Sequence, residues 1–203
     1  TAPAEWNETK KLIVLLGLSN AMKYIHKNNV IHLNLLPENV LLDKDFHPHI
    51  GGFSQSRNLP DTMVAGVSDS PIFIGFKVDV FSFGLIAFEI LTKNSPSEAK
   101  RQISKGNLVF PKGVGQNIKT IIHDCLDTDP NKRPTFEEIF QRISADQNCL
   151  ESPEALEYIE KLTDSSDNIE SDVDNLDFNN EIVQTFDTII NNGMFERILT
   201  KNF

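Results

Sequence analysis

The chain has 203 residues, of which 39% are hydrophobic and 24% are charged, and its formal net charge is -10. This length allows one domain with a sizeable core and a small appendage, and the acidic balance excludes nucleic acids and anionic membranes as partners. The longest early apolar run, Leu12 to Leu16, is far below the ~20 residues of a membrane span, and no secretory leader precedes it, so we expect a soluble, cytoplasmic protein.

The charge is distributed unevenly along the chain. Residues 1–150 carry 16 basic and 16 acidic side chains, whereas residues 151–203 carry 3 and 13. The whole net charge therefore belongs to the tail, which indicates a domain boundary near residue 150.

The first predicted element is a long, mostly buried helix from Thr9 to about Lys27, with Thr9 as its N-cap. A polar loop with the sequence "IHLNLLPENVLLD" follows between two apolar runs. Asn39–Leu42 and His49–Phe53 then have the pattern of two short strands, joined by turn-forming residues, which predicts a small hairpin.

The central part of the chain is predicted to be irregular at first and then helical. Residues 55–75 have little periodicity and are typical of a long loop. Residues 76–92 are apolar nearly all round, which predicts a helix at the centre of the core. Residues 117–143 predict two helices separated by a turn at Asp129-Pro130, and Thr135 with a glutamate three residues later predicts a capping box on the second helix.

The tail is predicted to contain short helical segments and a disordered stretch. Ser152-Pro153 begins a short amphipathic helix. The acidic stretch from Asp164 to Asp177 has the composition of a disordered segment, and Ile182 to Ile190 offers a second short apolar face.

Four segments, in this order, resemble the C-terminal lobe of a eukaryotic protein kinase over about residues 6–145. The loop "IHLNLLPENVLLD" is similar to the catalytic loop H-R-D-L-x-x-x-N, and "IGGFSQSR" to the segment that holds the D-F-G motif. "DVFSFGLIAFEIL" is similar to the buried central helix of that lobe, and "CLDTDPNKRPTF" to its closing helices. The resemblance implies a mainly α fold, a protein-kinase-like C-terminal lobe with a small β-hairpin near the catalytic loop.

The resemblance also implies that the groups needed for phosphoryl transfer are replaced. Asn34 stands at the position of the catalytic Asp, and losing a positioned general base typically costs ~10²–10⁴ in rate because an amide takes no proton at neutral pH. Leu36 stands where Ser/Thr kinases usually carry a lysine. Gly52 stands at the metal-binding Asp of D-F-G, and Ser54 at its glycine. We therefore expect no intact catalytic or metal site.

Asn39 matches the loop asparagine that binds the second metal ion in the family, which makes it a weak candidate ligand. A lone amide oxygen binds hard cations poorly, so we favour a role for this side chain in capping the local turn. No cofactor is expected, and ATP with magnesium is expected only if the family function is retained.

Four further residues match structural positions of the family. His32, Phe53 and Asp79 correspond to residues that tie the catalytic loop to the D-F-G region and to the central helix. Arg133 corresponds to an arginine that pairs with the glutamate of an A-P-E motif, and since that motif is absent before the central helix, its partner is open.

Cysteine and histidine spacing predicts no metal site. Cys125 and Cys149 are too few for a disulfide framework and are expected to be reduced thiols. Four histidines lack ligand spacing with cysteines or carboxylates: His26, His47, His49 and His123.

We expect a kinase-like C-terminal lobe at 1–148 and an acidic, partly disordered tail with short amphipathic helices at 149–203. No glycine-rich loop or strand lysine precedes the first helix, so the resemblance covers no N-terminal lobe. The leading hypothesis is a pseudokinase-like module that binds another protein at an uncovered apolar cleft floor around Leu41 and Phe53, or through the tail. The alternatives are a fragment of a Ser/Thr kinase that transfers phosphate from ATP in a longer natural protein, and a truncated gene product without function.

Overall fold

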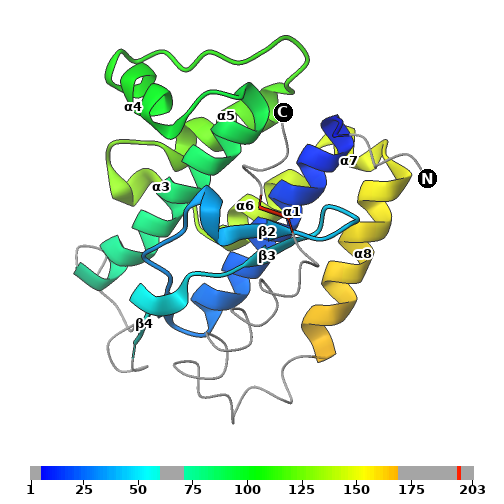
Figure 1. The fold of residues 1–203 in the computed structure, drawn as a ribbon, viewed down its shortest axis with the longest axis horizontal. Helices are drawn as coiled ribbons and strands as arrows, with labels where there is room; N and C mark the ends of the chain where they lie inside the picture. The colour runs from blue at the N-terminus through cyan, green and yellow to red at the C-terminus, as the bar shows by residue number, and fades with distance from the viewer. Residues whose placement is uncertain (1–5, 60–70, 169–195, 198–203) are drawn as a thin grey trace.

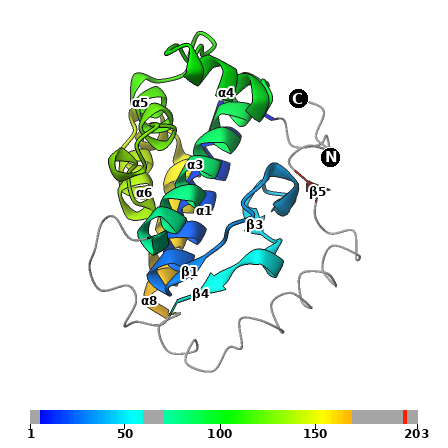
Figure 2. The same ribbon diagram turned by 90° about the vertical axis from the view of Figure 1, so that its left-hand side faces the viewer.

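The computed structural model describes residues 6–59, 71–168 and 196–197 (Figure 1). Helices make up most of this part of the chain, accompanied by small antiparallel sheets. The mainly helical fold predicted from the sequence is confirmed. In Figure 2 the strands lie on one side of the two longest helices, and α5 and α6 lie on the other.

Helix α1 (Glu8–Lys27) is buried along most of its length. It packs against α6, α8, α3 and the strand β3. Its N-cap is Asn7, whose side-chain oxygen accepts a hydrogen bond from the backbone N–H of Lys10 at 2.9 Å. The predicted N-cap, Thr9, is wrong because Thr9 already lies inside the first turn.

Helix α3 (Pro71–Thr92) is the predicted central helix, and it begins five residues earlier than expected. Its buried side chains include Phe83 and Phe88, neither of which has measurable exposure. Gly84 allows the close approach of α5, because a Cβ there would lie 2.8 Å from the Cγ of Leu126. The prediction that this helix forms the centre of the core is confirmed.

Helices α4 and α5 pack against α3, whereas α6 packs mainly against α1. The predicted pair separated by a turn is confirmed, and the capping box of α6 forms between Thr135 and Glu138. Helix α4 was not predicted from the sequence. The bounds are α4 Pro96–Ser104, α5 Gln116–Cys125, the 3-10 turn η3 Pro130–Lys132 and α6 Phe136–Ser144.

Two small sheets flank the predicted catalytic loop. β1 (Val30–Ile31) pairs antiparallel with β4 (Arg57–Asn58). The second sheet has the order β3-β2-β5, with β2 (Val40–Leu42) between β3 (Pro48–Ile50) and β5 (Glu196–Arg197). β2 and β3 form the predicted hairpin, which is confirmed. Two short 3-10 turns, η1 (Pro37–Asn39) and η2 (Phe53–Gln55), follow the loop and β3.

Two helices continue the fold beyond residue 146. They are α7 (Gln147–Leu150) and α8 (Pro153–Asn168). The predicted start of α8 is confirmed, but the prediction of disorder is wrong for residues 164–168, which are helical. The remainder of the acidic stretch and the apolar segment at 182–190 lie outside the described residues.

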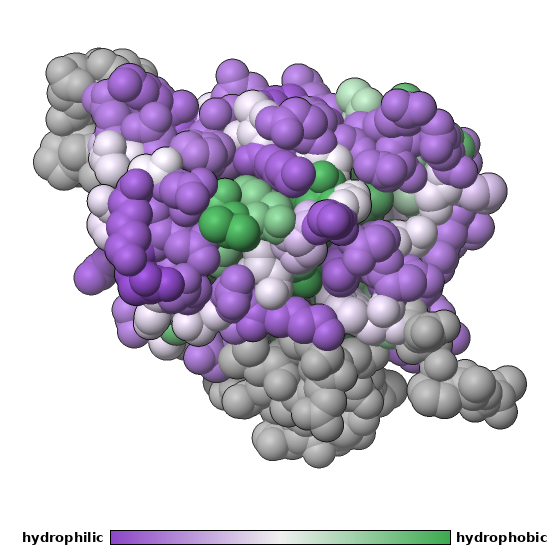
Figure 3. Space-filling model, turned by 90° about the horizontal axis from the view of Figure 1, so that it is seen from above, coloured by the Kyte–Doolittle hydropathy of each residue, from purple (hydrophilic) through white to green (hydrophobic). Residues whose placement is uncertain are grey.

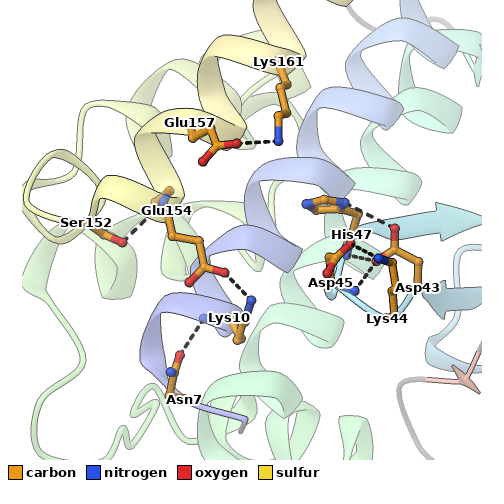
Figure 4. Close-up of polar contacts among 11 residues, drawn as sticks. Asn7, Lys10, Asp43, Lys44, Asp45, His47, Ser152, Glu154, Glu157 and Lys161 are labelled. Atoms are coloured by element: carbon orange, nitrogen blue, oxygen red, sulfur yellow. Dashed lines mark hydrogen bonds and ion pairs between the residues drawn. The ribbon is translucent and has the colours of Figure 1, made fainter. Parts of the chain in front are cut away.

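Helix α8 is held against α1 and the β2–β3 hairpin (Figure 4). Glu154 forms an ion pair with Lys10 of α1. Tyr158 is 8% exposed, and its ring stacks on His47 with the centroids 4.3 Å apart. Gly17 of α1 faces the Tyr158 hydroxyl and Pro48 with no room for a Cβ. The core that begins in α1 therefore continues beyond the boundary expected at residue 148.

Candidate functional site

The loop between β1 and β2 is anchored by one buried carboxylate. Asp79 of α3 has no measurable exposure. Its Oδ2 accepts the backbone N–H of His32 at 2.7 Å, and its Oδ1 accepts the backbone N–H of Leu33 at 2.8 Å. Oδ2 also lies 2.9 Å from Nε2 of His26 in α1. This one side chain therefore joins the loop to the two longest helices.

His32 is fully buried and joins the loop to the segment after β3. Its Nε2 donates to the carbonyl oxygen of Gly51 at 3.0 Å, and its Nδ1 accepts the backbone N–H of Asn34 at 3.2 Å. These two bonds require a neutral ring with the proton on Nε2. Burial lowers the pKa of His32, and this outweighs the opposing charge of Asp79.

The structure brings the predicted positions Asn34, Asn39 and Gly52 together. The side-chain amide of Asn34 donates to the carbonyl oxygen of Gly52 at 3.3 Å. The amide of Asn39 donates in turn to the backbone oxygen of Asn34 at 2.8 Å. Both amide nitrogens therefore bond to backbone within the loop region, which agrees with the expectation that Asn39 braces the local turn.

The space next to Gly52 is filled by Asn39. A Cβ at Gly52 would lie 2.7 Å from Oδ1 of Asn39 and closer still to its Cγ and Nδ2. Gly52 also has a φ of 82°, which side chains rarely adopt. An aspartate at this position would therefore require both backbone strain and displacement of Asn39. The residues present do not fit a magnesium site, since they offer an amide oxygen and no carboxylate.

Three apolar side chains are exposed in the loop or next to its anchor Asp79. Leu36, at the lysine position, is 46% exposed, and Leu33 is 37% exposed. Leu33 also has a φ of 60° and is held by its bond to Asp79. Val78, next to Asp79 on α3, is 40% exposed. None of the three belongs to the described core, and each presents part of its apolar side chain to solvent.

Phe53 and Leu41 do not form the open surface expected from the sequence. The ring of Phe53 packs on His32 with the centroids 4.7 Å apart, and it lies against the core. Leu41 is only 2% exposed. The expectation that Leu41 is uncovered is therefore wrong, because this residue is enclosed although it lies on a short outer sheet.

Arg133 lies apart from the loop and bonds to main-chain oxygens. Its Nε donates to the carbonyl oxygen of Asp127 at 2.8 Å, and its Nη1 donates to that of Lys77 at 2.9 Å. Its guanidinium lies over the ring of Phe81, 4.7 Å from the centroid. The sequence left the partner of Arg133 open, and the structure shows that the guanidinium is bound by two backbone carbonyl groups and one aromatic ring.

Glu89 is a charged residue that the sequence analysis missed. It lies on α3 with Oε2 buried and without a hydrogen-bond partner. Burial, together with the negative charge of Glu38 on η1, raises the pKa of Glu89. The available signal was one acidic residue inside the otherwise apolar sequence "GLIAFEIL".

The hairpin turn contains a second group that was missed. Ligand atoms of Asp43, Asp45 and His47 lie within 4.8 Å of one another, as Figure 4 shows. Oδ1 of Asp43 already accepts the backbone N–H groups of the other two residues. The prediction that His47 lacks ligand spacing with carboxylates is therefore wrong. The geometry is accounted for by a side-chain cap of the turn.

One cavity lies away from the loop, near the N-terminal ends of α1, α5 and α8. Its volume is about 450 Å³, and its lining includes Leu12, Leu91, Val114 and Ile118. Figure 3 shows apolar residues at the centre of the face seen from above, surrounded by hydrophilic ones. The cavity is separate from the predicted site residues, none of which lines it.

Within the described residues, no helix combines the length and hydrophobicity that a membrane span requires. The exclusion of a membrane-spanning helix made from the sequence is confirmed for that part of the chain.

Comparison with known proteins identifies the family. Residues 5–143 match the protein kinase domain. The probable serine/threonine-protein kinase kinX of Dictyostelium discoideum is 28% identical over 158 residues, which are 68% of this chain and 14% of that protein. The serine/threonine-protein kinase ULK3 of Xenopus laevis is 27% identical over 173 residues, which are 74% of this chain and 37% of that protein. The chain thus spans well under half the length of these relatives, and it belongs to the protein kinase domain family.

Proposed function

We propose that this chain is a kinase-like C-terminal lobe that does not transfer phosphate and that acts by binding another protein. The observation that carries the proposal is the contact between Gly52 and Asn39. At the point where the family places a metal-binding carboxylate, this chain has no side chain, and the side chain of a neighbour occupies the space.

The chemistry of phosphoryl transfer supports the same proposal. The reaction depends on metal ions that bridge the phosphates and on a carboxylate that accepts the proton of the attacking hydroxyl. Asn34 offers an amide, and that amide donates to Gly52. Leu36 offers an apolar side chain in place of a cation. The metal ligand, the proton acceptor and the positive charge are three separate requirements of the reaction. Restoring one of them would leave the other two unmet.

Protein binding is supported by the side chains that remain exposed around the loop. Leu33 and Leu36 in the loop, and Val78 next to Asp79, present apolar surface to solvent, and exposed apolar surface is what a protein partner covers on binding. Asp79 holds the backbone of the loop in place through two hydrogen bonds. The loop is therefore a fixed surface that requires little ordering when a partner binds.

The second candidate function is weak phosphotransfer to serine or threonine in a longer protein. It is favoured by the similarity to proteins named as serine/threonine kinases. It would require groups from elsewhere to supply the metal ligand and the base.

Thermal unfolding of the chain with ATP, in the presence of magnesium or of EDTA, tests the proposal. We expect one melting temperature in all conditions, and no transfer of labelled phosphate to the chain or to a general protein substrate. Saturation to 100 times the dissociation constant would stabilise the fold by about 2.7 kcal/mol. A magnesium-dependent rise in melting temperature together with phosphotransfer would therefore support the second function instead.

A pair of glycine variants tests the structural reason for inactivity. Gly52→Asp and Gly106→Asp place the same side chain at φ values of 82° and 70°, but the space around Gly106 is empty within 4 Å. We expect Gly52→Asp to destabilise the fold by about 1–3 kcal/mol more than Gly106→Asp, because only the former displaces a packed neighbour. Equal stability of the two variants, with ATP binding gained by the first, would show that the site accepts the family's aspartate.

A further inference from the structure

Strand β5 brings a distant part of the chain onto the hairpin next to the loop. β5 pairs antiparallel with β2, with Arg197 opposite Leu41 and Glu196 opposite Leu42. It also lies against the turn η1, and Figure 2 shows it beside the hairpin. The edge of β2 that faces away from β3 is therefore already occupied by this chain.

Leu41, which lies at this edge of the hairpin, is buried although it is not among the described core residues. Successive side chains of a strand point to opposite faces. Val40 and Leu42 belong to the described core, whereas Leu41 is not among its residues, although it is just 2% exposed. Leu41 is thus enclosed on the outer face of the hairpin, where β5 is its neighbouring strand.

We infer that the segment containing Glu196 and Arg197 acts as an intramolecular edge strand, which occupies β2 and encloses Leu41. An open sheet edge accepts an extended chain through main-chain hydrogen bonds. As long as its own segment occupies the edge, the hairpin is closed to an extended segment of another protein. This last step, that the segment competes with a partner, rests on the proposed function, whereas the strand pairing itself does not.

The register shows which backbone groups hold β5. The N–H of Asp43 donates to His47, across the hairpin. Because N–H groups alternate in direction along a strand, that of Leu41 points to β3 and that of Leu42 points to β5. Pro48, which has no N–H, lies opposite Leu42, in agreement with this alternation. Leu42 and Glu196 are therefore the pair that exchanges hydrogen bonds between β2 and β5.

Hydrogen exchange of single amides in the full chain tests the pairing. Glu196→Pro removes the N–H of the bonded pair and restricts the backbone, whereas Glu196→Ala keeps both. We expect the Leu42 amide to exchange at least about tenfold faster in the proline variant and unchanged in the alanine variant. The Leu41 amide, bonded to β3, should stay protected in all three proteins. A Leu42 amide that is unprotected in the unaltered chain, or equally protected in the proline variant, would overturn the inference.

A labelled peptide with the sequence of residues 190–203 tests whether the edge is closed. We expect it to bind the Glu196→Pro chain at least about tenfold more tightly than the unaltered chain, because a tethered segment acts at an effective concentration near the millimolar range. The same peptide with proline at the position of Glu196 should bind neither protein. Equal affinity for both chains would show that the edge is not occupied. Neither measurement uses nucleotide or a partner, so a failure here is distinct from a failure of the proposed function.

Discussion

Asp79 holds more of the candidate site together than any residue at which the family's chemistry is changed. Its two oxygens accept three donors, which are the buried backbone amide of His32, the partly buried amide of Leu33 and the partly buried His26 ring. A buried carboxylate of this kind is stable only while its partners remain. Since Asn34 and Gly52 contribute no charge, we infer that Asp79 is kept for the shape of the loop.

Replacing Asp79 tests this role. We expect Asp79→Ala to lower the free energy of unfolding by about 3–5 kcal/mol, since it leaves one buried and two partly buried donors without an acceptor. Asp79→Asn keeps one accepting oxygen and the same volume, and it should cost clearly less. Urea unfolding of both variants measures the difference. Equal losses would indicate that the charge, and not the hydrogen bonds, is what the fold requires.

The lowered pKa of His32 predicts how the stability of the fold depends on pH. Its pKa is lowered in the folded chain, chiefly by burial, so the folded protein binds this proton less readily than the unfolded chain, whose histidines titrate near pH ~6.5. The stabilising contribution of the neutral ring is complete above that pH and is lost as the pH falls below it, by at most ~1.4 kcal/mol per pH unit. Nitrogen NMR should show that, at pH 6.5, His32 is protonated to a smaller extent in the folded chain than in the urea-unfolded chain, and that its neutral form carries the proton on Nε2. A ring that is half protonated at pH 6.5 in the folded chain would contradict this.

For single residues, the motif match predicted which family positions carry other residues in this chain, but not how the space beside Gly52 is filled. The motif placed Asn34, Asn39 and Gly52 at three family positions. That Asn39 fills the space beside Gly52 depends on a positive φ and on a turn whose geometry no spacing rule contains. Glu89 was missed for a related reason, because a helical pattern shows that a face is buried but not that a carboxylate on it lacks a partner.

Among the elements, α1 shows where sequence reasoning is accurate and where it fails. Apolar periodicity identified the helix and its end, because burial determines both. The start was misplaced by two residues, because Asn7 and Thr9 both have side chains that cap helices. Only the backbone angles at Asn7, which are extended, decide between them.

A pair of alanine variants tests the cap of α1. We expect Asn7→Ala to destabilise the fold by about 1 kcal/mol, because it removes the acceptor of the Lys10 amide. Thr9→Ala, inside the first turn, should change stability by less than about 0.5 kcal/mol, since alanine favours helix. Thermal or urea unfolding measures both. A larger loss for Thr9→Ala would restore the boundary expected from the sequence.

For the molecule as a whole, α7 and α8 contribute side chains to the same hydrophobic core as α1. Cys149, Ala155 and Tyr158 belong to one cluster with the side chains of α1. The charge boundary near residue 150 was correct as a statement about composition, since the acidic excess lies beyond it. Charge does not report packing, however, and the apolar residues of α8 are too few to have indicated that the core extends this far.

The two thiols test whether the core opens as one unit. Cys125 and Cys149 are fully buried, and burial raises the pKa of Cys149 to about 12 and that of Cys125 further. Neither thiol should react with an alkylating reagent until the fold opens. If α7 and α8 open together with the rest of the fold, both cysteines will be modified at the same rate. Peptide mass spectrometry measures the two rates. In urea, where the chain is unfolded, both cysteines should react at the rate of an exposed thiol. Faster modification of Cys149 would show that these helices open separately.

The close contact between Gly17 of α1 and Tyr158 of α8 has a consequence for folding during synthesis on the ribosome. Tyr158 follows about 140 residues later, and a ribosome adding about 5–20 residues per second reaches it roughly 7–30 s after Gly17. During that interval Pro48, which also lies against Gly17, is already available, but the Tyr158 contact is missing and this part of α1 is incompletely covered. The nascent chain can complete its core only after nearly all of the kinase-like sequence has been made, so stalled or prematurely released chains will aggregate more readily than the full-length product.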